Sequence, residues 1–306
     1  MSIKIHHFSL PVSCPVYDES SGAVTQTQYE DNIVLILPEN YSENGAPTRL
    51  VIACHGAGGT VSSDTSQLEE SQVGRYLVAN GYAVMDVNGL PEKYASENGI
   101  DIRNNVGSPI AIQSYINAYK YCISNFNLKT DVFVHGGSMG GISSTNLVLS
   151  GLIPVIAHSA LCPVLDAYSE MFLHPWMEDL PKIALGRIYG LKKDGSGNYV
   201  YDAQKIGPYS PAQVITSKRY PVPVKFWHCE DDVVVSCEVT KKFVAAVNES
   251  GGHAELVTFD HGRHEPTLVG DILKNPSGKT NFMGEEVPVR IAAEGVFLWI
   301  KGFDRD

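Results

Sequence analysis

The segment VFVHGGSMGG, residues 132 to 141, joins an apolar run to four glycines that surround one serine and one methionine. Each glycine weakens a strand or helix interior by roughly 0.5–1 kcal/mol relative to alanine, so the cluster needs a local structural reason. A serine at a sharp strand-to-helix turn has strained backbone angles, and side chains two positions before and after it would collide. Gly136 and Gly140 remove that collision. The segment therefore predicts a strand, a tight turn at Ser138 and a helix.

Such a turn would lift the hydroxyl of Ser138 above the carboxyl edge of a sheet, where backbone N–H groups at the start of the next helix face any developing negative charge. The context supports this interpretation, because the apolar run DVFVH precedes the G-x-S-x-G pattern and the helix-compatible ISSTNLVLSG follows it. A phosphate-binding Walker loop needs GxxxxGK[ST], and a dinucleotide fingerprint needs glycine where Ser138 stands. The pattern indicates a nucleophilic serine, and we expect no cofactor.

Apolar runs alternate with helical patterns on both sides of this turn. Strand patterns occur at 49–56, 82–89, 131–137, 154–161, 220–231 and 253–260, and helical patterns at 66–81, 108–126, 138–151, 236–252 and 287–303. Two further β-rich runs, 3–16 and 25–38, suit an antiparallel pair at a sheet edge. Continuous apolar strands separated by helices predict a mostly parallel sheet with helices on both faces, which is an α/β fold.

The alternation stops between Pro163 and about residue 210, where tyrosine, phenylalanine, tryptophan and proline are frequent. We interpret this stretch as an aromatic-rich cap insertion that would form the acyl or alcohol pocket. No internal repeat or low-complexity tract appears, so residues 1–306 are expected to form a single domain with that cap. The stretch DGSGNY within it starts like a calcium loop, but Tyr199 and Lys205 occupy its sixth and twelfth positions, so we expect a hairpin turn.

Composition narrows the class of partner. The 23 basic and 34 acidic residues give a net charge of −11, and no Lys/Arg-rich run occurs, so nucleic acid and anionic membrane surfaces are not expected as partners. No apolar run approaches the ~20 residues that cross a bilayer, and the first residues lack a secretory pattern. The six scattered cysteines suit a reducing compartment. We expect a cytoplasmic protein; the oligomeric state does not follow from the sequence.

The loop HGAGG, residues 55 to 59, follows the apolar run RLVIAC. A serine nucleophile needs a second N–H donor for the oxyanion, and this loop is where the fold presents one. Ala57 or Gly58 is expected to give that donor, with Ala57 favoured, and Met139 is expected to give the other. A plain glycine-rich connection is the alternative interpretation.

Serine is a weak nucleophile until a histidine, oriented by a carboxylate, takes its proton. The expected chain order is serine, acid, histidine. The stretch HCEDDVVV, after the strand pattern VPVKFW, offers Glu230, Asp231 and Asp232; the stretch DHGRHEP, after ELVTF, offers His261 and His264. We favour Asp232 and His264, with His261 as the competing base.

These pieces together resemble the α/β-hydrolase fold, and more narrowly serine esterases of the acetyl xylan esterase, feruloyl esterase and polyhydroxybutyrate depolymerase type. The resemblance spans residues 33 to 265 and rests on LILPENY, VIACHGAGG, DVFVHGGSMGG, YSPAQVI, HCEDDVVV and the histidine loop after ELVTFD. It implies Asp232, the fifth residue of an HGxxD-like loop, as the acid and His264 as the base. Cys229 stands where that family usually has glycine, and HGRH replaces the more common GxGH.

The leading hypothesis is a serine carboxylic-ester hydrolase for small acyl esters, such as acetyl or feruloyl esters of carbohydrates, that works through an acyl-enzyme intermediate. One alternative is a small-peptide serine peptidase of the prolyl oligopeptidase type, and another is an α/β-hydrolase-like binding protein without catalysis. No metal is expected, because HGRHE lacks the helical HExxH spacing. His55, His135 and His158 are expected to be packed, hydrogen-bonded histidines.

Overall fold

The computed structural model describes residues 2–17, 23–174, 179–264, 279–288 and 291–305. The strands are β1 (Lys4–Tyr17), β2 (Val24–Leu37), β3 (Leu50–Cys54), β4 (Ala83–Val87), β5 (Val132–Gly137), β6 (Val155–Leu161), β7 (Val224–Cys229), β8 (Ala254–Phe259), β9 (Lys279–Phe282) and β10 (Glu285–Pro288). The helices are η1 (Gln67–Glu69), α1 (Gln72–Ala79), α2 (Glu92–Glu97), α3 (Pro109–Asn125), α4 (Met139–Ser150), η2 (Tyr168–Phe172), α5 (Leu180–Ile188), α6 (Ala203–Ile206), η4 (Gly207–Tyr209), α7 (Pro211–Val214), α8 (Cys237–Glu249) and α9 (Ile291–Phe303).

Eight strands form one sheet in the order β1-β2-β4-β3-β5-β6-β7-β8. The six strands from β3 to β8 are parallel to one another, whereas β2 pairs antiparallel with β4 and with β1. All five residues of β3 and of β4 are buried, because helices cover both faces of the sheet. The carboxyl ends of the parallel strands therefore meet at one edge, and this edge carries the Ser138 turn.

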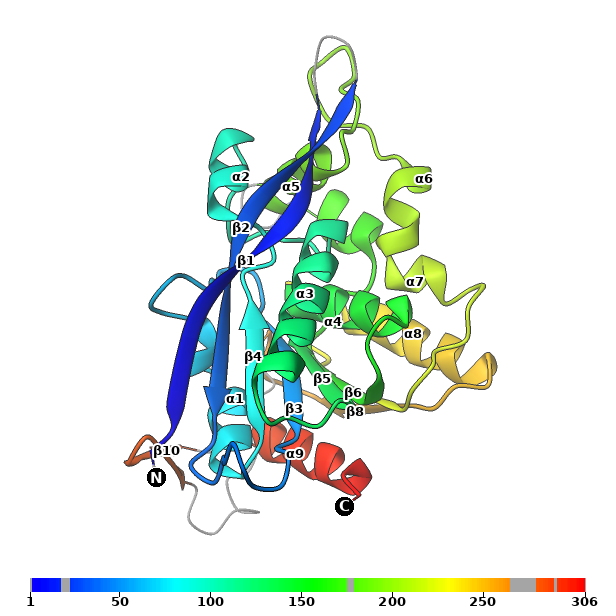
Figure 1. The fold of residues 1–306 in the computed structure, drawn as a ribbon. Helices are drawn as coiled ribbons and strands as arrows, with labels where there is room; N and C mark the ends of the chain where they lie inside the picture. The colour runs from blue at the N-terminus through cyan, green and yellow to red at the C-terminus, as the bar shows by residue number, and fades with distance from the viewer. Residues whose placement is uncertain (1, 18–22, 175–178, 265–278, 289–290, 306) are drawn as a thin grey trace.

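The N-terminal hairpin forms one end of the sheet, as predicted. Lys4 lies opposite Leu37 and Tyr17 opposite Val24, so the two strands pair over their whole length. The first half of β2 is exposed, whereas the second half, from Ile33 to Ile36, pairs with β4 and is buried. The hairpin consequently projects beyond the sheet, and the end of β1 lies beside the loop after α5 (Figure 1). There the ring of Tyr17 packs close to Gly190.

Two hydrophobic clusters hold the helices to the sheet. On one face, apolar side chains of α3, α4 and α8 pack on the strands, and on the other face α1 and α9 do so. Figure 1 shows α9, at the C-terminus, beside α1 and beneath the sheet. This arrangement confirms the expected α/β architecture. No helix among the described residues is long and apolar enough to span a bilayer.

Some predicted helix boundaries were wrong. The pattern at 66–81 begins with the short helix η1, and α1 starts only at Gln72, where the Ser71 hydroxyl accepts a hydrogen bond from the Gly74 N–H at 3.2 Å. The C-terminal helix was expected from residue 287, but Val287 and Pro288 pair with Thr280 and Lys279 in the β9–β10 hairpin. Proline has no N–H to donate to a neighbouring strand, but at the end of a strand no such donor is required, so Pro288 is compatible with this pairing.

The insertion between Pro163 and residue 210 contains short helices packed around a third hydrophobic cluster. Its aromatic rings contact one another: the centroids of Tyr168 and Tyr201 are 4.6 Å apart, and those of Phe172 and Tyr201 are 5.2 Å apart. The stretch DGSGNY is a hairpin turn, as predicted, closed by an antiparallel bridge between Lys193 and Tyr199.

Candidate functional site

Ser138 lies in a sharp turn between β5 and α4. Its φ of 53° and ψ of −124° place a non-glycine residue in a sparsely populated backbone region, at a cost of about 1–3 kcal/mol that the surroundings must offset. Two hydrogen bonds hold the turn: the Ser138 N–H donates to the Leu161 carbonyl and the Val164 N–H donates to the Ser138 carbonyl, both at 2.9 Å. Strand β6 and the residues after it thus fix the backbone that presents the hydroxyl.

The flanking glycines are required by close packing. A Cβ atom on Gly136 would lie 2.3 Å from the Gly140 carbonyl oxygen, and one on Gly140 would lie 1.9 Å from the Cys54 carbonyl oxygen. Gly137, in contrast, has no heavy atom within 4 Å of such a position. A side chain two residues before or after the serine would therefore collide, as expected, and the atoms that it would meet include backbone atoms.

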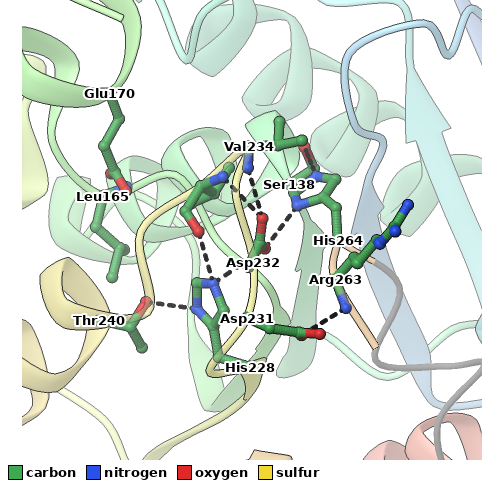
Figure 2. A network of polar contacts seen from close by, with 11 residues as sticks. Ser138, Leu165, Glu170, His228, Asp231, Asp232, Val234, Thr240, Arg263 and His264 are labelled. Atoms are coloured by element: carbon green, nitrogen blue, oxygen red, sulfur yellow. Dashed lines mark hydrogen bonds and ion pairs between the residues drawn. The ribbon is translucent and has the colours of Figure 1, made fainter. Parts of the chain in front are cut away.

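Ser138, His264 and Asp232 form a continuous chain of hydrogen bonds (Figure 2). His264 Nε2 lies 2.8 Å from Ser138 Oγ, and His264 Nδ1 lies 2.8 Å from Asp232 Oδ2. The histidine side chain is 24% exposed, whereas the aspartate side chain is completely buried. A buried carboxylate at Nδ1 fixes the ring orientation and leaves Nε2 to accept a proton from the serine.

Asp232 is held as a carboxylate by the donors around it. Burial by itself would raise its pKa, but hydrogen bonds from His228, His264 and the Val235 N–H outweigh this effect and hold the pKa well below its usual value. Its Oδ1 accepts hydrogen bonds from the Val234 and Val235 N–H groups at 2.9 and 3.0 Å. The acid is therefore ionised over the whole neutral range.

The other acids and the other histidine of the two loops lie outside this chain of contacts. Glu230 forms an ion pair with Lys241 at 3.1 Å. Asp231 accepts hydrogen bonds from the N–H groups of Gly262 and Arg263, at 3.3 and 2.7 Å, and so anchors the histidine loop. The His261 side chain is 89% exposed and its Nδ1 lies 3.8 Å from Asp231. Of the alternatives, only Asp232 and His264 are brought to Ser138.

The loop expected to supply an oxyanion donor approaches the serine. The loop from His55 to Gly59 passes so close that a Cβ on Gly56 would be 3.7 Å from Ser138 Oγ. Within the described part of the chain, neither the Ala57 N–H nor the Met139 N–H donates a hydrogen bond. Met139 is the first residue of α4, so its N–H is one of the unpaired donors of a helix start. The N–H groups of Ala57 and Met139 are thus unpaired within that part of the chain, and their use as oxyanion donors stays a prediction.

A cavity of about 490 Å³ opens beside Ser138 and His264. Its walls come from the His55–Ala57 loop, from the region of η1 and α1, and from the ends of β5 and β6; its polar wall residues include Gln67, Glu70, Ser71 and Gln72. None of the described residues of 163–210 lines it. The described part of the aromatic insertion does not form this pocket, contrary to expectation, because its rings pack on one another and on the third hydrophobic cluster. Trp176 lies outside the described residues.

The remaining core histidines are hydrogen-bonded, as expected. His135 Nδ1 lies 2.9 Å from Ser159 Oγ, and His158 contacts Ser144 and Tyr220. Burial lowers the pKa of His135 to about 4 and that of His158 to about 3, so neither is charged near neutral pH. His55 Nδ1 lies 3.0 Å from Asp86 Oδ2.

One group of metal-ligand side chains also occurs here. The candidate ligand atoms of Cys162, His228 and Asp232 lie within 4.8 Å of one another. Hydrogen bonding accounts for this proximity, because His228 Nε2 lies 3.2 Å from Asp232 Oδ2 and 3.1 Å from the Val235 carbonyl. Sequence reasoning missed His228. The available signal was a histidine near the end of an otherwise apolar strand, four residues before the acid.

Comparison with solved structures places the fold among α/β-hydrolases. Pyrococcus horikoshii acylaminoacyl peptidase superposes with a TM-score of 0.62 at 14% identity, covering 100% of this chain and 42% of that one. A puromycin-hydrolyzing peptidase of Mycobacterium tuberculosis gives 0.57 at 19% identity, with 84% of this chain and 37% of that one covered. Dipeptidyl peptidase 4 of Porphyromonas gingivalis gives 0.56 at 14% identity, with 87% and 33% covered.

The chain thus spans well under half the length of these solved proteins. No protein-family model matches the sequence, and no curated protein matches it. At these identities the likeness establishes the α/β-hydrolase fold that the sequence predicted.

Proposed function

We propose that this protein is a serine hydrolase that cleaves a small substrate through an acyl-enzyme intermediate. The observation that carries the proposal is the hydrogen-bonded chain from Ser138 through His264 to Asp232, with 2.8 Å at each step. Nucleophile, base and orienting acid stand in the order and geometry that this chemistry needs. The neighbouring cavity of about 490 Å³ falls within the size range of small-molecule sites, about 300–1,000 Å³.

The proposed reaction has two steps. Ser138 Oγ attacks the carbonyl carbon of the substrate while its proton moves to His264 Nε2, and the N–H groups of Ala57 and Met139 stabilise the oxyanion. The intermediate collapses to an acyl-serine, and His264 gives the proton to the departing amine or alcohol. Water then attacks the acyl group, again losing its proton to His264, and the acid is released as Ser138 regains its hydrogen. Asp232 keeps Nδ1 oriented and stabilises the transient imidazolium.

For the substrate class we favour short peptides or other small amides. The solved proteins with the same fold include an acylaminoacyl peptidase, a puromycin-hydrolyzing peptidase and a dipeptidyl peptidase, and this supports amide cleavage over ester cleavage. A small-ester hydrolase, with carbohydrate esters among its substrates, is the second candidate. It is supported by the polar cavity wall of Gln67, Glu70, Ser71 and Gln72, whose side chains can hydrogen-bond to sugar hydroxyls.

The test compares kcat/KM for aminoacyl-p-nitroanilides with that for p-nitrophenyl acetate and butyrate. Wild type is expected to turn over both kinds of substrate, with the amides preferred once the intrinsic reactivity of each leaving group is taken into account. Ser138→Ala is expected to lower kcat by about 10³-fold or more, because it removes the attacking oxygen. Activity retained in Ser138→Ala would overturn the proposal, and failure of wild type to react with a fluorophosphonate would favour a non-catalytic binding protein.

The compartment is also a proposal. All six cysteines are buried and unpaired. Persistently reduced cysteines are typical of a reducing compartment, which supports action in the cytoplasm.

A further inference from the structure

His228 lies directly behind the acid of the proposed site. It is the fifth residue of β7, and Asp232 follows four residues later in the loop that leaves the strand. Both side chains are completely buried. His228 Nε2 lies 3.2 Å from Asp232 Oδ2, the same oxygen that faces His264 Nδ1 at 2.8 Å. Figure 2 shows the two imidazole rings on opposite sides of this carboxylate.

The remaining contacts of His228 determine which nitrogen carries the hydrogen. Nε2 lies between the Asp232 carboxylate and the Val235 carbonyl oxygen, which is 3.1 Å away, so both of its neighbours are acceptors. Nε2 must therefore carry a hydrogen. Nδ1 lies 2.9 Å from the hydroxyl of Thr240 on α8. A ring protonated at Nε2 offers a lone pair at Nδ1, which accepts the hydrogen of that hydroxyl.

We propose that His228 is a positioning residue, which holds the Asp232 carboxylate in the rotamer that directs Oδ2 to His264, and that Thr240 holds His228 in turn. The inference rests on the proposed hydrolase function and extends the described chain of contacts to five side chains: Thr240, His228, Asp232, His264 and Ser138. The two backbone N–H groups on Asp232 Oδ1 fix one oxygen of the carboxylate. The Nε2–H of His228 fixes the other oxygen from the side that His264 does not occupy.

A matched pair of variants at position 228 removes or keeps a hydrogen-bond donor to Asp232 while the side-chain volume stays nearly constant. His228→Leu removes the Nε2–H, and His228→Gln keeps an amide N–H that can reach Asp232. His228→Leu is expected to lower kcat by about 10- to 100-fold, the usual cost of losing an outer partner of a functional side chain. KM is expected to stay the same because His228 does not line the cavity. His228→Gln should recover most of kcat. His253→Leu is the control. His253 is an exposed histidine at the opposite edge of the sheet, so its replacement should leave kcat and KM unchanged.

A pH profile separates positioning from simple packing. Among the described residues, the titratable groups around Asp232 are His264, His228 and the thiols of Cys162, Cys229 and Cys237; burial raises the pKa of each thiol above its usual value. With the His228 hydrogen bond lost, the pKa of Asp232 rises towards its usual value. A more basic carboxylate at Oδ2 binds the protonated form of His264 more strongly, and the acid limb of kcat/KM reports protonation of the base. The limb should therefore move to higher pH in His228→Leu and return in His228→Gln. A packing defect would change stability without moving this limb.

The threonine supplies a second pair of variants should His228→Leu fail to fold. Thr240→Val removes the hydroxyl at constant shape, and Thr240→Ser keeps it; Thr240→Val should have the lower kcat. Wild-type kcat in a folded His228→Leu, or equal kcat in the two threonine variants, would overturn the positioning role. These outcomes are distinct from failure of the proposed function, which would appear as activity that survives Ser138→Ala.

Discussion

His261 and His264 stand three residues apart in HGRH, yet only one of them reaches Ser138. The difference arises from Asp231, whose carboxylate accepts hydrogen bonds from the Gly262 and Arg263 N–H groups. Arg263 has a φ of 53°, so the chain reverses there in a conformation uncommon for a side-chain-bearing residue. The reversal leaves His261 in solvent and directs His264 towards the serine.

At this scale we predict opposite results for the two histidines. His264→Ala is expected to lower kcat for a p-nitrophenyl ester by about 10³-fold or more, since Ser138 loses its base. His261→Ala is expected to change kcat by less than about twofold, because an exposed pair 3.8 Å long contributes little. Steady-state kinetics give kcat for the two variants, once both are shown to have the same thermal stability. A large loss in His261→Ala would contradict the proposed base.

At the scale of the element, the β5–α4 turn depends on how closely the backbone of α4 approaches the end of β3. Gly140 lies against the Cys54 and His55 carbonyl oxygens, so α4 can begin beside the His55–Gly59 loop only if position 140 carries no side chain. The loop containing Ala57 also approaches the turn, because a Cβ on Gly56 would be 3.1 Å from Ser138 Cβ. Close packing of this turn therefore requires glycine at position 140.

Two neighbouring glycines test this requirement. Gly140→Ala is expected to lower the free energy of unfolding by about 1–3 kcal/mol or more, because backbone atoms cannot yield to the new methyl group. Gly137→Ala should cost much less, since its methyl group would meet no atom within 4 Å. Urea unfolding at constant pH gives both values, and the loss of backbone freedom in the unfolded chain is the same for both substitutions. Equal destabilisation would show that steric contact is not what selects glycine at 140.

At the scale of the whole molecule, Arg49 joins three distant parts of the chain. Its guanidinium donates to the carbonyl and carboxylate of Asp131, at 2.8 and 2.5 Å, and to Asp304 Oδ1 at 2.9 Å. Tyr82 donates to the second oxygen of Asp304 at 3.0 Å. These contacts connect the start of β3, the approach to β5 and the end of α9. They lie at the opposite edge of the sheet from Ser138.

Arg49→Leu is accordingly predicted to destabilise the protein without affecting the site. The guanidinium is 6% exposed but its partners are partly solvated, so we expect a loss of about 1–3 kcal/mol in the free energy of unfolding. Lys129→Leu is the control, because its contact with Asp304 is 3.9 Å long and should contribute less than about 1 kcal/mol. Denaturant unfolding and kcat are measured on both. A changed kcat in folded Arg49→Leu would contradict the separation of the two edges.

Much of the fold and of the candidate site could be predicted because the signals are local. Alternation of apolar runs and helical patterns predicted the parallel sheet, and the glycine spacing predicted the turn at Ser138. The chain order of strands narrowed the acid and base to two short loops. The β9–β10 hairpin and the start of α1 were missed, since short segments near turns carry no clear period.

By itself, then, the sequence determined the α/β class, the strand–turn–helix at Ser138 and the short loops that carry the acid and the histidine, since each depends on residues adjacent in the chain. Only the tertiary structure decided that Asp232 and His264 meet Ser138, that His228 lies behind the acid, and that the cavity is bounded by the η1–α1 region. These contacts join residues up to 126 positions apart. Their distances depend on how strands and loops pack, which no local pattern encodes.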